Sequence, residues 1–455
     1  MDNKASRSNA ASSGNDTRLS RRTFVCGSFA AAMVASTEPS LSQEPPIPVP
    51  MPIAQGVNYF ECVETHFDRL IHYALDRYGS TRSAIWMSSL DINTNELSQV
   101  ADVQPANDMR FVPGAYWYAD QPMLVAAHAV ATRSACKCYS DSADEYLRSY
   151  FHLVNDDASL QSLRETYWDA ADDRQQPVGL LRSMLPSCTP AWETMWRVGR
   201  ERTTRIINRE ADRLLQTSNL SMPELNIAIE SLLWLARQSD ERKTSASDHV
   251  SLLVSSGENQ NKPPNKLMPR SQSVEAMRFS ANCLAAAKSI DKSWLHDIGL
   301  EFGNAVCNLV ADDAKANDAL ASAINEMDLR IAQCCLAIEG ASNEIQLGDL
   351  VNQTVNRIGQ ALNNADHAIE TSGVFGRAIY FLQSASISAQ RPEYLELAKQ
   401  VADVAIDKLF VEDCGMFRSR VGVDRCDAVD GIGYLMLALL AIDDNDPTAG
   451  SAFSF

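Results

Sequence analysis

The sequence predicts an all-helical protein whose folded part is one (α/α) toroid, a closed ring of helical hairpins. Apolar residues recur at spacings of three and four along most of the chain beyond residue 57, which is the period of a helix with one buried face. The predicted helices come in pairs separated by short polar breaks, and one such pair cannot bury its apolar face alone. The pairs differ in length and long loops separate them, which favours a ring over a regular solenoid.

The N-terminus is predicted to carry an export signal. Polar residues 1–19 lead into Ser20-Arg21-Arg22-Thr23-Phe24, and a short run of small, mildly apolar residues follows. This pattern resembles the bacterial twin-arginine signal. We therefore expect a twin-arginine signal peptide over residues 1–36, the twin-arginine export machinery as a partner, and a periplasmic or secreted location. The apolar run is too short for a permanent membrane span.

A proline-rich linker is expected over residues 37–56. Prolines at 39, 45, 46, 48, 50 and 52 exclude helical and ladder hydrogen bonding over this stretch. The toroid domain is therefore expected to occupy residues 57–455.

The helical elements follow in order along this domain. A first helix is expected over 58–78, and a polar stretch over 80–114 indicates loop with a short strand. The hairpins are then predicted at 121–132 with 139–153, 224–237 with 245–254, 274–288 with 294–310, and 376–388 with 394–410. The remaining features are a long loop over 255–273, a less regular helix pair within 312–362, and a last apolar helix over 434–442.

Charge and motifs exclude several classes of function. The formal net charge of -18 repels phosphate backbones, so we expect no nucleic-acid partner. An anionic ligand would need a local basic patch. The cysteines match no zinc spacing, and most of them are expected to be small core residues. Phosphate-cradling, serine-hydrolase and zincin motifs are absent from the sequence, so we expect no metal and no cofactor.

Several segments carry a resemblance to a known group of proteins. They lie at 73–79 leading into 83–91, at 120–124, at 144–147, at 190–198, at 415–418 and at 427–435. Together they resemble secreted bacterial (α/α)-toroid proteins of the six-hairpin glycosidase and polysaccharide lyase type. The resemblance implies a carbohydrate ligand bound at the loop rim of the ring, with hydrolysis or elimination across a uronate as the reaction. A catalytically inactive carbohydrate-binding or scaffold protein is the alternative, because a fold does not guarantee its chemistry.

The middle of the chain departs from the lyase pattern. The sequence holds 7 histidines, and residues 200–350 lack a loop with the arginine and histidine that a uronate lyase requires. His367 follows Asp366, and an Asp-His neighbour can tune a general base. Adjacent helical residues point apart, however, so this pair is a weak candidate.

Two aromatic and acidic segments are the predicted ligand site. Aromatic rings stack on the apolar faces of sugars, and a glycosidase needs two carboxylates about 5–9.5 Å apart. The expected catalytic residues are Asp120, Asp169 and Tyr118. The expected substrate-binding residues are Tyr116, Trp117, Trp168, Arg174, Trp192 and Asp430. We expect the loops 116–120 and 167–173 to converge on one concave pocket at the rim, with their carboxylates close together; the alternative is that Tyr116 to Asp120 form a helix cap and core.

Glu193 and Asp427 complete the set of candidate carboxylates. Asp427 and Asp430 stand three residues apart directly before the last apolar helix. Capping of that helix is the simpler interpretation of this pair.

Overall fold

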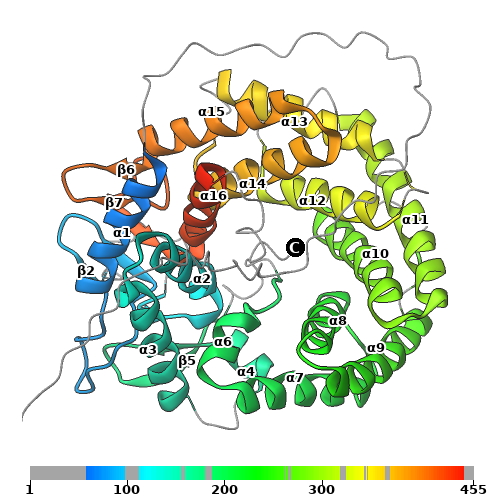
Figure 1. Ribbon diagram of the computed structural model, residues 1–455, viewed down its shortest axis with the longest axis horizontal. Coiled ribbons are helices and arrows are strands. Elements are labelled where there is room, and N and C mark those ends of the chain that lie inside the picture. Colours follow the sequence, from blue (N-terminus) through cyan, green and yellow to red (C-terminus); the bar gives the residue numbers. More distant parts are fainter. Residues whose placement is uncertain are drawn as a thin grey trace, which may run out of the picture.

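The computed structural model describes residues 58–97, 112–154, 159–179, 187–260, 262–264, 268–317, 324–342, 345, 347–363 and 369–444. In this part of the chain the helices form a ring around a central axis (Figure 1). The predicted signal peptide, the proline-rich linker and His367 lie outside the described residues. Among the described helices, none has both the length and the apolar character needed to cross a bilayer.

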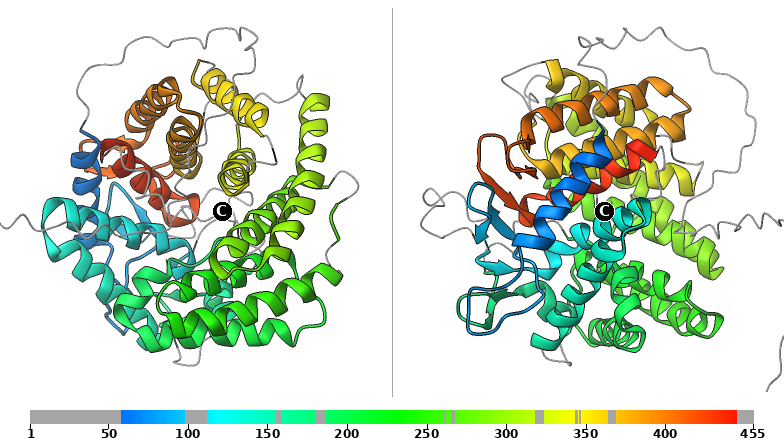
Figure 2. Two further views of the ribbon diagram at one scale, coloured as in Figure 1. Left: turned by 45° about the vertical axis from the view of Figure 1, so that its right-hand side comes forward. Right: turned by 60° about the vertical axis from the view of Figure 1, so that its left-hand side comes forward.

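The ring has an inner and an outer layer of helices that alternate along the chain (Figure 2). The inner helices are α2 (Trp117–Ser134), α8 (Met222–Ala236), α10 (Arg270–Ile290), α12 (Glu326–Ala341), α14 (Ser372–Ala389) and α16 (Ile432–Asp444). The outer helices are α1 (Tyr59–Tyr73), α3 (Lys137–Leu153), α7 (Arg200–Leu215), α9 (Asp240–Gln260), α11 (Ser293–Asn317), α13 (Gly348–Asn363) and α15 (Pro392–Leu409).

The two layers differ in how much of each helix is buried. In α10 every residue from Ser273 to Leu284 is buried, because inner helices contact neighbours on all sides. In α7 the buried residues recur at spacings of three and four, as in Thr203, Ile206 and Ile207. Such one-sided burial is expected for a helix with one face in solvent.

Helix α16 closes the ring. It packs against α14 on one side and against α2 and α1 on the other. At the closing contact, a Cβ added to Gly433 would lie 2.5 Å from the Met123 backbone nitrogen. Between α2 and α8 the short helix α6 (Trp192–Val198) completes the inner layer, since Trp192 donates to Ser231 Oγ at 2.9 Å. These contacts confirm the predicted toroid.

Small sheets bring distant segments together at the ends of the helices. Strand β1 (Ser89–Asp91) pairs with β2 (Glu96–Leu97) and with β8 (Arg425–Asp427). The second sheet joins β3 (Gly114–Ala115), β4 (Thr166–Asp169) and β5 (Arg174–Pro177), and β6 (Phe410–Val411) pairs with β7 (Met416–Phe417). The β1–β8 pairing ties the start of the domain to its end.

The structure corrects several predicted boundaries. Helix α1 ends at Tyr73 rather than at residue 78, because Leu75 pairs with Trp86 in a β-bridge. The break predicted over 255–273 is shorter, since α9 reaches Gln260 and α10 begins at Arg270. The pair predicted as less regular, α12 and α13, has the least contact between its two helices among the described hairpins. Helices α4 (Leu160–Glu165), α6 and α7 were not among the predicted elements.

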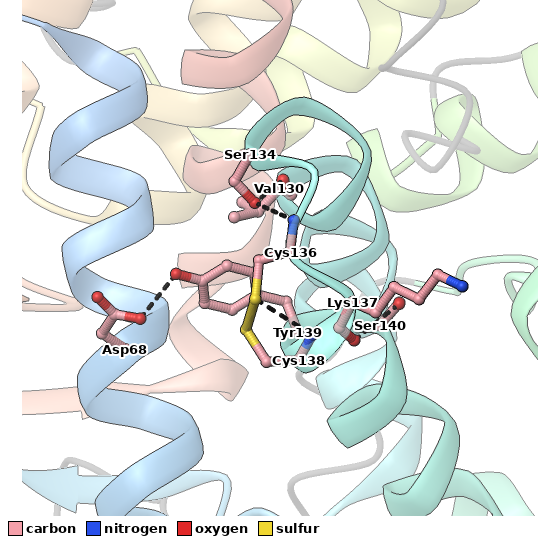
Figure 3. The surroundings of a disulfide bond; sticks show 8 residues. All are labelled: Asp68, Val130, Ser134, Cys136, Lys137, Cys138, Tyr139 and Ser140. Atoms are coloured by element: carbon pink, nitrogen blue, oxygen red, sulfur yellow. Dashed lines mark hydrogen bonds between the residues drawn. A yellow bond between two sulfur atoms is a disulfide. The ribbon is translucent and has the colours of Figure 1, made fainter.

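A disulfide stands at the start of α3 in the described part of the chain. Cys136 and Cys138 form a disulfide there, and Cys136 Sγ accepts a hydrogen bond from the Cys138 backbone N–H (Figure 3). The adjacent Tyr139 donates to Asp68 of α1 at 2.7 Å. The predicted core role of most cysteines is confirmed, because the buried thiols are those of Cys188, Cys283, Cys307, Cys334, Cys335 and Cys426.

Candidate functional site

The two predicted site segments lie side by side. Strand β3 pairs with β4 so that Gly114 faces Asp169 and Ala115 faces Trp168. Residues 116–120 therefore start α2 directly beside Tyr167 to Asp169, which form a strand rather than the predicted loop.

The aromatic side chains of these segments are buried. Tyr116 and Trp117 have no exposed surface, and Trp168 is 5% exposed. Tyr116 donates to the Arg164 carbonyl at 2.5 Å, and Trp117 lies against Phe151. This placement is the core alternative that the sequence left open, and a sugar-stacking role for these rings stays a prediction.

Asp120 is a buried carboxyl between α2 and α3. It accepts hydrogen bonds from Ser88 Oγ at 2.7 Å and Tyr146 Oη at 2.6 Å. Burial raises the pKa of Asp120 to about 7, although both hydrogen bonds act in the opposite direction. At neutral pH this carboxyl is therefore protonated in part of the molecules. It lies in the first turn of α2 and is not the N-cap, which is Tyr116.

We expect Asp120→Asn to flatten the pH dependence of stability. The ordinary pKa of this carboxyl is 3.8 and the folded value is about 7. Its protonated form therefore stabilises the fold below about pH 4, and this stabilisation is lost as the pH rises toward 7. The asparagine stays neutral throughout. Thermal unfolding measured between about pH 4 and 8 should show wild type losing stability relative to the variant.

Asp427 serves as a constant background in that comparison. Burial, with the charge of Asp430, raises the pKa of Asp427 well above the ordinary value. Asp427 therefore makes stability fall with rising pH in both wild type and Asp120→Asn. Parallel profiles for wild type and Asp120→Asn would show that the pKa of Asp120 is not raised.

Asp169 and Arg174 lie at the β4–β5 turn. Asp169 accepts from the backbone N–H groups of Ala171 and Asp172, each at 3.0 Å. Arg174 is exposed and donates to Asp172 at 2.7 Å. Both side chains therefore stabilise the turn. The catalytic role of Asp169 stays a prediction.

Asp430 and Asp427 form a buried cluster with arginines at the β8 end. Asp430 accepts from Arg420 at 3.3 Å, and Asp427 lies 3.2 Å from Arg425 Nε. Asp427 caps the short 3-10 turn before α16 by accepting from the Val429 N–H. The expectation that Asp427 caps the last helix is therefore wrong, because Asp427 caps the 3-10 turn before it.

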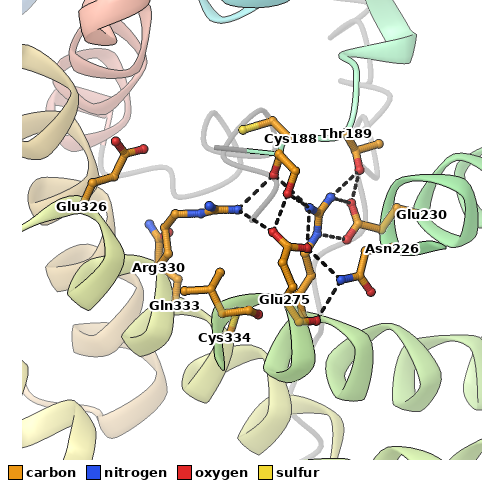
Figure 4. Close-up of polar contacts among 12 residues, drawn as sticks. Cys188, Thr189, Asn226, Glu230, Glu275, Glu326, Arg330, Gln333 and Cys334 are labelled. Carbon is orange, nitrogen blue, oxygen red and sulfur yellow. Dashed lines mark hydrogen bonds and ion pairs between the residues drawn. The ribbon is translucent and has the colours of Figure 1, made fainter. Parts of the chain in front are cut away.

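Polar side chains from the inner layer converge on the segment Ser187–Thr189 (Figure 4). Tyr118 of α2 donates to the Cys188 carbonyl at 2.5 Å. Tyr434 of α16 lies 3.2 Å from Cys188 Sγ. Because the other contacts to this segment come from α8, α10, α12 and α14, it lies inside the ring. We call the segment Ser187–Thr189 and the polar side chains gathered around it the axial cluster. Besides Tyr118 and Tyr434, these side chains are Asn226, Glu230, Glu275, Arg278, Asn282, Glu326, Arg330, Gln333 and Arg377.

Arg278 is the centre of charge in the axial cluster. It has no exposed side-chain surface, and it contacts Glu230 through Nε at 2.6 Å and Glu275 through Nη1 at 3.6 Å. It also donates to the Ser187 carbonyl at 2.9 Å. Burial alone would raise the pKa of Glu230, but Arg278 and hydrogen bonds from Thr189 and Asn282 hold it below the ordinary value. Glu230 is therefore an ionised carboxylate facing the axis.

Helices α12 and α14 add further donors on the other side. Arg330 donates to the Ser187 carbonyl at 2.9 Å, and Arg377 pairs with Glu326 at 2.9 Å. Arg330 Nε and Gln333 Nε2 are buried and have no hydrogen-bond partner among the described residues. An unsatisfied buried donor costs about 1–3 kcal/mol, so these groups favour an acceptor from a ligand at this position.

Glu230, Glu275, Arg278 and Arg330 were not among the residues predicted from the sequence to form the site. Each is a charged residue within an otherwise buried inner helix. These residues could have been found as charged residues inside apolar runs, because a fully buried charge requires a partner. Arg278 and Arg330 come from helices rather than from loops.

The axial cluster holds carboxylates and guanidinium groups but no described histidine. In the described part of the chain, no group of three or more His, Cys, Asp or Glu residues could hold a metal ion. Trp192, predicted to bind substrate, is 2% exposed and packs beside the cluster through its bond to Ser231. The arrangement offers hydrogen bonds and fixed charges to a polar, hydroxyl-rich ligand.

Comparison with known proteins gives similarity to solved structures alone. No protein-family model matches the chain, and no curated protein matches it. The α-1,6-mannanase GH76A of Salegentibacter sp. HEL1_6 is similar over 84% of this chain and 98% of its own, with 10% sequence identity and a TM-score of 0.42. An inactive variant of that enzyme in complex with α-1,6-mannotetrose is similar over 86% and 100%, with 9% identity and a TM-score of 0.42. Similarity at this level carries no information on side chains or substrate.

Proposed function

We propose that this protein is an exported carbohydrate-active protein that binds a polysaccharide or oligosaccharide at the axis of its ring. The convergence of polar side chains from the inner helices on the axial cluster carries this proposal. Sugar hydroxyl groups need many donors and acceptors in fixed positions, and an inner helical layer provides a rigid frame for them.

A cleavage reaction at the axis would use groups in two protonation states. Glu230 supplies an ionised carboxylate, suited to a base or a nucleophile. Burial, with the Cys188 thiol beside it, raises the pKa of Tyr434 well above its ordinary value, so this phenol stays protonated and can donate. Hydrolysis and elimination both need such a pair, and the products distinguish them.

A non-catalytic carbohydrate-binding or scaffold protein is the second candidate. One observation favours it: Asp120 and Tyr118 are buried and hydrogen-bonded to protein groups. Residues in that state stabilise a fold without touching a substrate.

The test is a screen of the purified full chain against neutral polysaccharides, including α-1,6-mannan, and uronic polysaccharides. Reducing ends report hydrolysis, and absorbance of unsaturated products reports elimination. We expect Glu230→Gln to lower the cleavage rate by at least about 100-fold, and the exposed Glu396→Gln to retain it. Circular dichroism of each variant checks the fold.

Three outcomes separate the candidates. Loss of cleavage activity in Asp120→Asn or Asp169→Asn, together with full activity in Glu230→Gln, would show that the site lies at the β3–β4 segments. Saturable binding of a polysaccharide without any product would support the binding protein. Neither product nor binding across the whole screen would contradict a carbohydrate function.

A further inference from the structure

A second concave site lies on the outer layer of the ring. It is a pocket of about 580 Å³ between the C-terminal end of α3, α6 and the first turns of α7. We call it the α3–α7 pocket. None of the residues that line it belongs to the axial cluster, and α3 and α7 stand in the outer layer (Figure 1).

The lining of this pocket is strongly basic. Arg148, Arg200, Arg202 and Arg205 face it, against one carboxylate, Glu201. The whole chain has 40 basic and 58 acidic residues, so the pocket reverses the sign of the protein's overall charge. A basic concave site attracts anions because the low-dielectric walls focus its field.

The arginines differ in whether other protein groups already bind their guanidinium groups. Arg148 pairs with Glu145 at 3.0 Å, and Arg202 donates to the Phe151 carbonyl at 3.0 Å. Arg200 lies over the Trp196 ring at 5.8 Å, an interaction that leaves its N–H groups able to donate. Arg200 and Arg205 are both exposed, so these two side chains are the best placed to meet an anion from solvent.

The pocket also has an apolar wall. Phe151, Met195 and Val198 line it, and Phe151 and Met195 are 4% and 1% exposed. In addition, Gly199 at the start of α7 provides no side-chain cap, so the positive end of the helix dipole adds to the field of the arginines. A ligand that fits has negative groups on one side and an apolar face on the other.

We propose that the α3–α7 pocket binds an acidic oligosaccharide through its carboxylate groups. A sugar ring has an apolar face for Val198, and uronate carboxylates match guanidinium geometry. This site is separate from the axial cluster and requires no reaction there. It gives an acidic protein a place to hold an acidic carbohydrate.

Isothermal titration calorimetry of the full chain tests the proposal with trigalacturonate as the probe. Maltotriose, inorganic phosphate and inorganic sulfate serve as comparison ligands. We expect trigalacturonate to bind and maltotriose not to bind. We expect Arg200→Gln/Arg205→Gln to weaken binding at least about tenfold, and Glu201→Gln to tighten it. Raising the ionic strength from about 0.05 M to 0.5 M should weaken it because screening is stronger.

The matched control is Lys243→Gln/Lys399→Gln, which removes the same charge from the exposed Lys243 on α9 and from Lys399 on α15, whose side chain is 45% exposed. An equal loss of affinity in this control would overturn the proposal, since the overall charge would then be responsible. Equal binding of maltotriose, or binding of phosphate and sulfate without trigalacturonate, would overturn it as well. If Glu230→Gln abolishes binding of the probe and Arg200→Gln/Arg205→Gln does not, the probe binds at the axial cluster. The two variants therefore distinguish a failure of the pocket proposal from a failure of the proposed function.

Discussion

Replacing Arg278 with methionine is expected to lower the free energy of unfolding by about 3–5 kcal/mol. The side chain has no exposed surface and compensates two carboxylates, Glu230 and Glu275. Without the guanidinium group, both carboxylates would remain buried with one fewer positive partner, and the Ser187 carbonyl would lose a donor. Denaturant unfolding, followed by circular dichroism, measures the loss.

Two further variants interpret that measurement. Arg148→Met removes an arginine whose side chain is 53% exposed, and a change within about 0.5 kcal/mol is expected. The double variant Arg278→Met/Glu230→Gln should recover part of the loss, because it removes one stranded charge. A single Arg278→Met change as small as that of Arg148→Met would contradict the buried ion network.

Gly433→Ala is expected to destabilise the protein by about 2–3 kcal/mol or more. The new Cβ would lie 2.5 Å from the Met123 backbone nitrogen and 2.7 Å from Pro122 Cβ. The nearest of these atoms belongs to the backbone of α2, so α16 would have to move away from α2. This contact closes the ring, and the lost packing extends over both helices.

Gly348→Ala is the matched control for the closing contact. Its Cβ would meet nothing within 4 Å, and Gly348 is the first residue of α13, so the added methyl group costs no packing. We expect an unchanged or slightly higher melting temperature for this variant. Equal melting temperatures for Gly433→Ala and wild type would mean that α16 does not seal against α2 as described.

The two expected effects bear on function through one physical fact. The axial cluster exists only because the ring is closed, since Tyr118 of α2 and Tyr434 of α16 contact the same residue, Cys188. A variant that opens the contact between α2 and α16 should therefore disturb ligand binding at the axis, even though Gly433 has no side chain.

The candidate site shows where sequence reasoning reached its limit. The aromatic and acidic composition of residues 116–120 and 167–173 predicted their proximity, and the β3–β4 pairing places them side by side. Their composition did not predict burial, because Tyr116 and Trp117 are covered by residues from α3 and α4. Conversely, Glu230 and Arg278 stand in runs that predicted only buried helix.

By itself the sequence determined that this chain forms paired helices, because the spacing of apolar residues records locally which face of each helix is buried. It also determined the order of those pairs and a strongly acidic overall charge. Only the tertiary structure decided which polar residues share the axis and where arginines gather on the outer layer. Those groupings depend on distances between helices far apart in the chain, and no local pattern records such distances.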